Sequence, residues 1–174
     1  MNLPARGLHR LERVQLLERP IDEVFAFYAD ATNLEALTPP FLRFRVVTPT
    51  PIAMRAGTRI DYTLSLYGVP IRWRTLITHC KPGVGFVDEQ EAGPYAHWRH
   101  EHEFEARGRA TLMRDTVDYR EPLGVVGQLA HVLFVRKTLD RIFDFRRDAA
   151  HRLLGAPRSD APVSDAPGAA PRVA

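Results

Sequence analysis

The 174-residue sequence predicts one α+β domain, in which a curved antiparallel sheet of about seven strands wraps around a long C-terminal helix. Three observations predict it. Apolar and polar residues alternate in about six successive segments between residues 41 and 121. Two short helical segments follow an opening strand, and the last apolar segment has helical spacing. A one-sided sheet must cover its apolar face, and the long helix is the only predicted element able to do so.

The N-terminal part of the chain predicts one strand and two short helices. Residues 8–18 place apolar side chains among charged ones, as in a strand with one buried face. The first helix is expected to begin at Pro20, because its fixed φ suits a first helical position and acidic residues follow it. A second short helix is expected over 33–37, where the pair Pro39 and Pro40 ends it.

The middle of the chain predicts the remaining strands. The clearest segment is 57–67, where Ile60, Tyr62 and Leu64 share one face. The predicted strands are 41–48, 57–67, 71–77, 84–91, a histidine-rich strand within 93–104, and 111–121. Short turns join them, which is typical of an antiparallel meander.

The C-terminal part predicts a long helix followed by a tail. Residues 126–154 carry an apolar stripe at helical spacing, and Gly155 is expected to cap the helix. From residue 156 onward the chain repeats Ala, Pro, Ser and Asp with few large apolar residues. We therefore expect a folded ligand-binding domain over 8–155 and a disordered tail over 156–174.

Composition excludes several classes of protein. The net charge is only +3, and no run of Lys and Arg is interleaved with aromatic residues, so we expect no nucleic-acid partner. Cys80 is the single cysteine, which excludes an internal disulfide and favours a reducing cytoplasm. No segment approaches the roughly 20 apolar residues of a membrane span. We expect a cytoplasmic protein with no stable membrane insertion, and its oligomeric state stays open.

The segment GPYAHWRHEHEF, residues 93–104, contains three of the seven histidines. Strand geometry directs alternate side chains to opposite faces. Trp98, His100, His102 and Phe104 then share the inner face, whereas His97 and its polar alternates face outward. On the following strand the same alternation directs Met113, Asp115 and Tyr119 inward.

Three interpretations of these inward polar residues stay open. His100, His102 and Asp115 could satisfy one another as a buried polar network. They could instead hold the polar end of an apolar ligand. They could also form a two-histidine, one-carboxylate metal site. Because no fourth ligand or matched motif is present, we expect no metal and no cofactor.

Three more residues are candidates for the cavity wall. Arg146 follows the apolar stripe of the long helix, so its head lies either at the helix edge or inside the cavity, paired with Asp115 or with a ligand's acid group. Tyr62 and Trp73 are either core aromatics or stacking surfaces for a ligand. Cys80 is interpreted as a half-buried core residue, because it lies in no nucleophile motif.

The fragments PIDEVFAFYADATNLEALTPP, GPYAHWRHEHEF and ATLMRDTVDYREPLG, in this order, resemble the SRPBCC superfamily of START, pollen-allergen and polyketide cyclase/dehydrase proteins. They are most similar to bacterial members of its coenzyme Q-binding-like branch. The resemblance covers about residues 8–154 and implies a helix-grip fold with an elongated cavity for lipids, quinones or polyketides. The glycine-rich loop of some relatives is reduced here to residues 81–85, so no phosphate binding is assigned to it.

Together these features predict a protein that binds a small hydrophobic ligand, such as a lipid, a quinone or a polyketide-like molecule. A variant of this function is a quinone or lipid chaperone acting with a membrane enzyme. The alternative is a cyclase- or dehydrase-like enzyme that uses a cavity histidine for acid/base chemistry. We favour binding without catalysis and assign no catalytic residue. The predicted ligand-binding residues are Tyr62, Trp73, Trp98, His100, His102, Phe104, Met113, Asp115, Tyr119 and Arg146.

Overall fold

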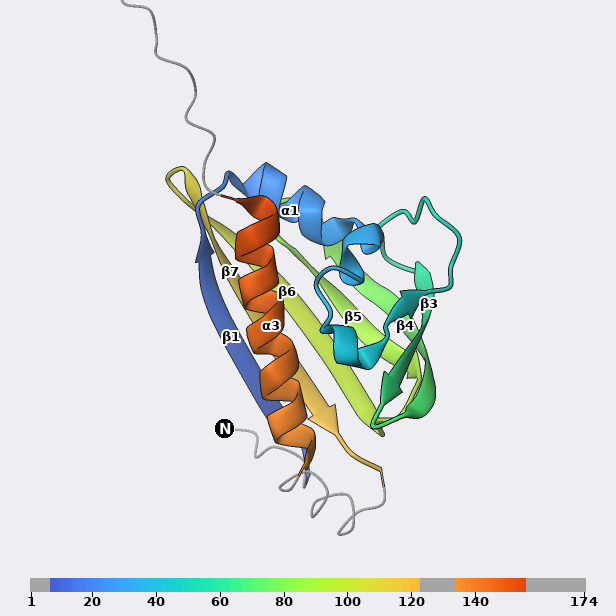
Figure 1. Ribbon diagram of the computed structural model, residues 1–174. Helices are drawn as coiled ribbons and strands as arrows, with labels where there is room; N and C mark the ends of the chain where they lie inside the picture. Colours follow the sequence, from blue (N-terminus) through green and yellow to red (C-terminus); the bar gives the residue numbers. More distant parts are fainter. Residues whose placement is uncertain (1–6, 123–133, 156–174) are drawn as a thin grey trace, which may run out of the picture.

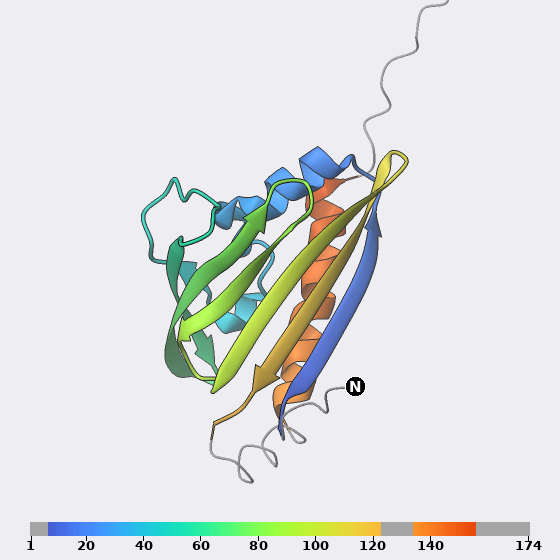
Figure 2. The same ribbon diagram turned by 180° about the vertical axis from the view of Figure 1, so that it is seen from behind.

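The computed structural model describes residues 7–122 and 134–155. Over these residues a seven-stranded sheet curves around one long helix, which confirms the predicted α+β, helix-grip fold (Figures 1 and 2). The elements are β1 (His9–Leu17), α1 (Ile21–Ala29), η1 (Ala31–Leu34), η2 (Pro40–Leu42), β2 (Arg45–Val46), β3 (Arg59–Leu66), β4 (Val69–Lys81), β5 (Gly85–Ala92), β6 (His97–Arg107), β7 (Ala110–Arg120) and α3 (Arg136–Leu154).

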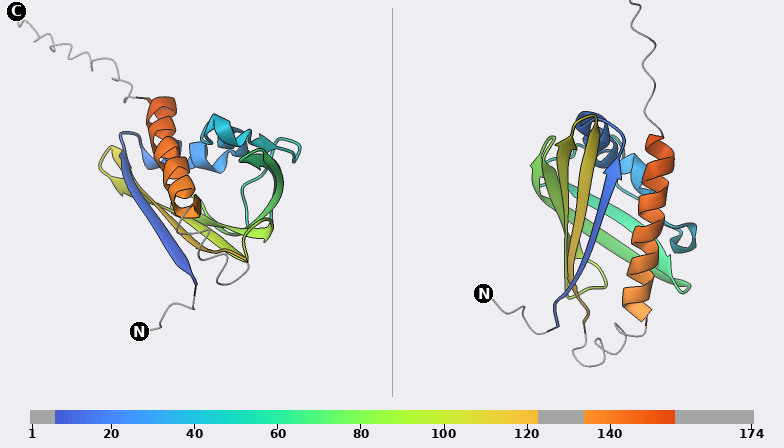
Figure 3. Two further views of the ribbon diagram at one scale, coloured as in Figure 1. Left: turned by 60° about the horizontal axis from the view of Figure 1, so that its bottom comes forward. Right: turned by 90° about the vertical axis from the view of Figure 1, so that its left-hand side faces the viewer.

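The sheet has the strand order β1-β7-β6-β5-β4-β3-β2, and every neighbouring pair is antiparallel. From β2 to β7 each strand pairs with the next one along the chain, as the short turns predict. The opening strand β1 closes the order by pairing with the last strand, β7. Figure 3 shows that the sheet curves and that α3 lies on its concave side.

Helix α3 covers the β1–β7–β6 end of the sheet through a narrow apolar stripe. Leu139 and Phe143 are buried in one cluster with Leu11, Val117 and Tyr119 of β1 and β7. Gly155, at φ 67°, ends the helix, and its N–H donates to the carbonyl of the residue four positions earlier at 3.1 Å. The predicted glycine cap is therefore present. The remainder of the predicted helix, 126–133, and the predicted tail, 156–174, lie outside the described residues.

The short N-terminal helix α1 packs beside the other end of β6 and β7. Val24 and Tyr28 are buried, and they share a cluster with Phe86, Phe104 and Met113 of the sheet. The helix begins at Ile21, one residue after the predicted start at Pro20, which occupies the capping position instead. Helix α1 thus closes one end of the concave face.

Two predictions about the segment after α1 were wrong in detail. The predicted helix over 33–37 is a 3₁₀ turn over 31–34, prolonged by single turn hydrogen bonds. The predicted strand over 41–48 is reduced to the two residues of β2. Its first residues form the 3₁₀ turn η2, because Pro40 begins that turn and Arg43 ends it in the left-handed region at φ 46°. None of the helices in the described ranges is long and apolar enough to cross a membrane.

Candidate functional site

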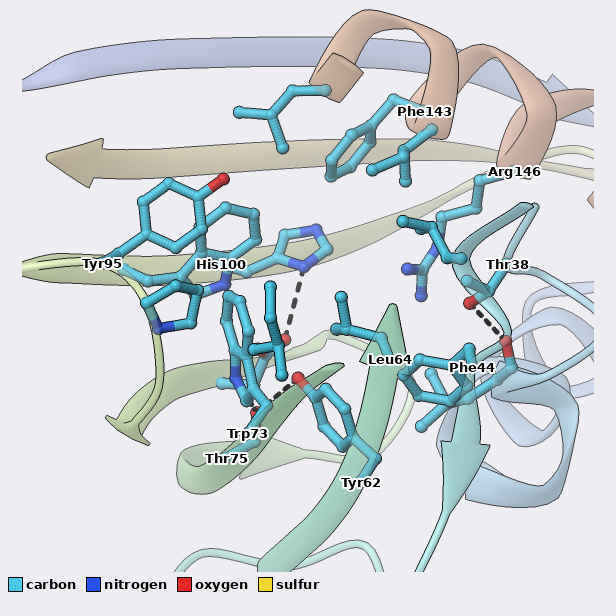
Figure 4. A pocket seen from close by; sticks show the side chains of 18 of the residues that line it. Thr38, Phe44, Tyr62, Leu64, Trp73, Thr75, Tyr95, His100, Phe143 and Arg146 are labelled. Carbon is cyan, nitrogen blue, oxygen red and sulfur yellow. Dashed lines mark hydrogen bonds and ion pairs between the residues drawn. The ribbon is translucent and has the colours of Figure 1, made fainter. Parts of the chain in front are cut away.

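A cavity of about 210 Å³ lies between the concave face of the sheet and α3. Strands β3, β4, β5 and β6 supply one wall, α3 supplies the opposite wall, and the segment around η1 and η2 closes one side. Most of the side chains that line it are aliphatic or aromatic. Figure 4 shows Phe143 and Arg146 entering from α3, opposite Tyr62 and Leu64 of β3.

Five aromatic side chains form a continuous wall at one side of the cavity. Trp73 is at the centre: its ring lies 5.2 Å from that of Trp98, 5.7 Å from that of Tyr95 and 5.9 Å from that of Tyr62. Phe44 extends the wall at 4.7 Å from Tyr62. Buried polar atoms in this wall are satisfied locally, because the indole N–H of Trp73 donates to the hydroxyl of Thr75 at 3.1 Å and Tyr62 hydrogen-bonds the same hydroxyl at 3.0 Å. The wall therefore presents flat apolar surface to the cavity.

The polar part of the site is a cluster of two histidines and two aspartates. His100 and His102 come from β6, Asp115 from β7 and Asp88 from β5, and the strand register places the four side by side. His100 has Nδ1 3.4 Å from Asp88 Oδ2 and Nε2 3.2 Å from Asp115 Oδ1. His102 has Nε2 3.3 Å from Asp88 Oδ2 and Nδ1 2.7 Å from Asp115 Oδ1. Each imidazole thus bridges both carboxylates.

One of these four contacts is short without being a hydrogen bond. His102 Nδ1 is buried and has no well-aligned hydrogen-bond partner among the described residues, although Asp115 Oδ1 lies 2.7 Å away. The contact is bent, so it acts through charge more than through a directed N–H. Phe86 stacks on the other side of the His102 ring, with centroids 4.2 Å apart. The ring is held in place by packing as well as by its carboxylate neighbours.

Burial and charge shift the pKa values of the cluster in different directions. Burial lowers the pKa of His100, and the neighbouring charge of His102 lowers it further. Burial also acts to lower the pKa of His102, but the nearby charges of Asp115 and Asp88, together with the hydrogen bond to Asp88, raise it above its usual value. Burial acts to raise the pKa of both carboxyls, but the histidines outweigh it and hold both values below normal. Within the cluster the carboxylates favour the charged form of His102, whereas burial favours the neutral form of His100.

Arg146 is the other polar group that lines the cavity. Its head points inward from α3 in Figure 4, and its Nε is buried with no hydrogen-bond partner among the described residues. Its positive charge helps to lower the pKa of Asp88, but no ion pair joins it to Asp115, so the predicted pairing of these two residues within the protein is not formed. Its neighbour Arg147 instead pairs at the surface with Asp144 and Asp148.

The predicted site residues fall into two groups in the structure. Six of them line the cavity: Tyr62, Trp73, Trp98, His100, His102 and Arg146. The other four, Phe104, Met113, Asp115 and Tyr119, face inward as strand alternation predicts, but they are buried and do not line the cavity. The three apolar ones pack beside α1 and α3, and Asp115 lies against His100 and His102.

Sequence reasoning missed some of the residues that line the cavity. Asp88 is the main residue left out of the predicted site, although alternation from Phe86 along β5 directs it to the inner face, and the register places it opposite His100. Tyr28 from α1 and Phe143 from α3 also line the cavity, and no pattern within one segment predicts which helical residues reach it. Cys80 is half-buried, and its thiol lies 3.4 Å from the Met54 carbonyl, as expected for a core residue.

Comparison with known proteins agrees with this architecture. Residues 17–145 match the family described as polyketide cyclase/dehydrase and lipid transport. The chain belongs to this family. It is thereby also a member of the wider START/SRPBCC group. No curated protein matches the sequence of this chain.

Solved structures of the START/SRPBCC group share the fold at low sequence identity. TTHA0849 from Thermus thermophilus is 18% identical, with a TM-score of 0.63 over 84% of this chain and 97% of that one. A START superfamily protein from Mycobacterium smegmatis is 11% identical, with a TM-score of 0.63 over 83% and 99%. The Zhui aromatase/cyclase from Streptomyces sp. R1128 is 14% identical, with a TM-score of 0.60 over 84% and 96%. At these identities the similarity shows the fold alone.

Proposed function

We propose that this protein binds a small apolar molecule in the cavity and holds one hydrogen-bond-accepting end of it with Arg146. The ligand class is a lipid, a quinone or a polyketide-like molecule that carries an acid or carbonyl oxygen. Aromatic walls supply apolar contact area, and a few convergent polar groups fix the orientation, as is usual in small-molecule sites. The family to which the chain belongs joins polyketide cyclases and dehydrases with lipid transport, which supports the same ligand class.

The observation that carries this proposal is the unpartnered Nε of Arg146. A buried donor without an acceptor is costly, and a charged donor more so. In this cavity the guanidinium lies among mostly aromatic and aliphatic side chains, and Asp88, whose pKa its charge helps to lower, already pairs with two histidines. An acceptor on a bound ligand would remove that cost, since Arg is suited to bind carboxylate or carbonyl oxygens through more than one N–H.

Native mass spectrometry of the freshly purified protein, followed by organic extraction, tests this function. We expect an adduct of small-molecule mass that is lost on extraction, and an extract enriched in one acidic or carbonyl-bearing apolar compound. Recovery of a quinone or a lipid would in addition favour the chaperone variant. Arg147→Met serves as the matched control for Arg146→Met, because the two arginines are adjacent but only one enters the cavity. An empty wild-type protein that also binds no fatty acid, quinone or polycyclic aromatic acid would contradict the proposal.

A second candidate function is cyclase- or dehydrase-like catalysis, and the position of His100 favours it. This imidazole lines the cavity, and a carboxylate contacts each of its ring nitrogens, so it could remove or deliver a proton at a bound carbonyl compound. Incubation of a poly-β-keto thioester analogue with the protein, with product analysis by mass spectrometry, separates the two functions. Ring closure that is lost in His100→Gln would establish catalysis, whereas recovery of unchanged substrate would leave binding as the function.

A further inference from the structure

The polar cluster contains a three-residue donor set with the spacing of a metal site. One ligand atom from each of Asp88, His100 and His102 lies within 4.8 Å of the others. His100 Nδ1 and His102 Nε2 lie 3.4 and 3.3 Å from the same oxygen, Asp88 Oδ2. In a tetrahedral zinc site with bonds of about 2.0–2.1 Å, neighbouring ligand atoms are about 3.3 Å apart. Two of the three edges therefore already have the length that a bound ion requires.

Hydrogen bonds alone do not pair all of the ring nitrogens in this cluster with the carboxylates. All four ring nitrogens of His100 and His102 face carboxylate oxygens, but a neutral imidazole carries only one N–H. With both rings neutral only two of the four contacts can be hydrogen bonds, and with one ring charged only three can; in each remaining contact a nitrogen lone pair faces an oxygen lone pair. Two imidazolium ions would satisfy all four contacts, but the ring centroids are only 3.8 Å apart in a buried setting. His102 Nδ1 is accordingly buried without a hydrogen-bond partner among the described residues.

We propose that Asp88 Oδ2, His100 Nδ1 and His102 Nε2 bind one divalent transition-metal ion, with Asp115 as the outer carboxylate that orients both rings. The ion takes the lone pairs that face Asp88. The opposite ring nitrogens, His100 Nε2 and His102 Nδ1, then both carry hydrogen and face Asp115 Oδ1 at 3.2 and 2.7 Å. Metal-bound histidines commonly donate their other N–H to a carboxylate in this way. Two carboxylates also balance the charge of a divalent ion, so the buried cluster becomes neutral.

The arrangement leaves the open coordination positions on the cavity side. Asp88, His100 and His102 line the cavity, whereas Asp115 lies behind the rings in the core. Two histidines and one carboxylate with open positions suit Zn²⁺ and Fe²⁺. A carbonyl or phenolate oxygen of a bound molecule could occupy an open position, where the ion would polarise it. The metal site does not depend on the proposed apolar ligand, since all of its protein donors are present without one.

Metal titration of the chelator-treated full-length protein tests this proposal without any organic ligand. We expect one equivalent of Zn²⁺ to bind by calorimetry, and one equivalent of Co²⁺ to give the visible absorption of a low-symmetry site. Affinity should fall more than about 100-fold in Asp88→Ala and in His102→Gln. It should fall about 10–100-fold in Asp115→Asn, because that change alters the orienting carboxylate and keeps the three ligands. His97→Ala should bind as the wild type does, because His97 lies on the opposite face of β6.

A measurement on the wild-type chain covers the case in which buried variants fail to fold. Long-range ¹H–¹⁵N spectra of the histidine side chains should show that Zn²⁺ shifts the ring nitrogens of His100 and His102 and leaves His97 unchanged. Absence of Zn²⁺ and Co²⁺ binding to the wild type at 100-fold excess would overturn the proposal. Unchanged binding in Asp88→Ala and His102→Gln, or shifts confined to other histidines, would overturn it as well. Loss of metal binding with intact binding of an apolar ligand would separate this site from the proposed function.

Discussion

His102 Nδ1 lies 2.7 Å from Asp115 Oδ1, and both side chains are almost completely buried between β6 and β7. The register of the two strands sets this pair directly opposite each other. A buried pair of this kind is costly to break, because removal of one partner leaves the other charge without compensation.

Asp115→Asn should therefore destabilise the metal-free protein by about 3 kcal/mol or more. The matched control is Asp118→Asn on the outer face of the same strand, where the carboxylate pairs with the mostly exposed Arg10. A surface pair of that kind contributes at most about 1 kcal/mol. Urea denaturation of both variants measures the difference. Similar small losses in both would show that the buried cluster does not depend on the charge of Asp115.

The pH dependence of stability should come mainly from the two carboxyls. Asp88 and Asp115 have folded-state pKa values below normal, so their stabilisation is present above about pH 4 and is lost as the pH falls further. The pKa shifts of the two histidines have opposite effects on stability near pH 6.5. The lowered pKa of His100 makes stability fall as the pH decreases, whereas the raised pKa of His102 makes it fall as the pH increases.

Urea denaturation of the metal-free protein at a series of pH values checks this expectation. The free energy of unfolding should fall steeply below about pH 4, whereas the two histidines should contribute changes of opposite sign near pH 6.5. In Asp115→Asn the decline at acidic pH should be shallower, because one of the two shifted carboxyls is gone. An identical slope in the variant and the wild type would show that other groups cause the acid sensitivity.

A contact between the exposed turn after β3 and helix α3 should control ligand exchange. The hydroxyl of Tyr67, in the turn between β3 and β4, hydrogen-bonds Thr138 of α3 at 3.0 Å, and both residues line the cavity. Tyr67→Phe should cost at most about 1.5 kcal/mol of stability, because one exposed hydrogen bond is lost. It should speed ligand release several-fold, measured by stopped-flow fluorescence. Thr138→Val should have the same effect and add nothing to Tyr67→Phe, and additive effects would show that the two residues act separately.

The C-terminal tail should contribute little to stability. The sequence after Gly155 contains few residues able to form a core, and the helix cap is complete at Gly155 itself. We expect truncation after this residue to leave the melting temperature within about 2 °C of the full chain, which corresponds to less than about 1 kcal/mol at this size. Differential scanning calorimetry measures the change, and a large decrease would show that the tail packs against the domain.

The sequence predicted the sheet well because alternation is a local property that burial of one face enforces. It placed His100, His102 and Asp115 inward and His97 on the other face, as the structure has them. The strand predicted over 41–48 was too long, since β2 has only two residues. Arg43 in the left-handed region interrupts the extended chain, and alternation of side chains does not reveal this.

The site was harder to predict, because it depends on which inward residues the helices leave uncovered. Met113 and Tyr119 point to the same face of the sheet as His100, but α1 and α3 pack over them. Asp88 faces inward by alternation along β5, but it joins the cluster only through the register of β5 with the next strand, β6. Alternation within one strand does not fix that register.

The most direct test of the cavity as a binding site uses the two tryptophans of the chain. Both of them, Trp73 and Trp98, lie in the cavity wall, so intrinsic fluorescence reports occupancy without a label. We predict a saturable change on titration with an apolar carboxylic acid. Arg146→Met should weaken the affinity about 10-fold or more, since a hydrogen bond to a charged group contributes about 1.5–3 kcal/mol. Arg147→Met should leave it within about two-fold of wild type, because a surface ion pair contributes at most about 1 kcal/mol and this one lies outside the cavity. A wild-type protein with no saturable change, or equal affinities in the two variants, would contradict the proposed binding site.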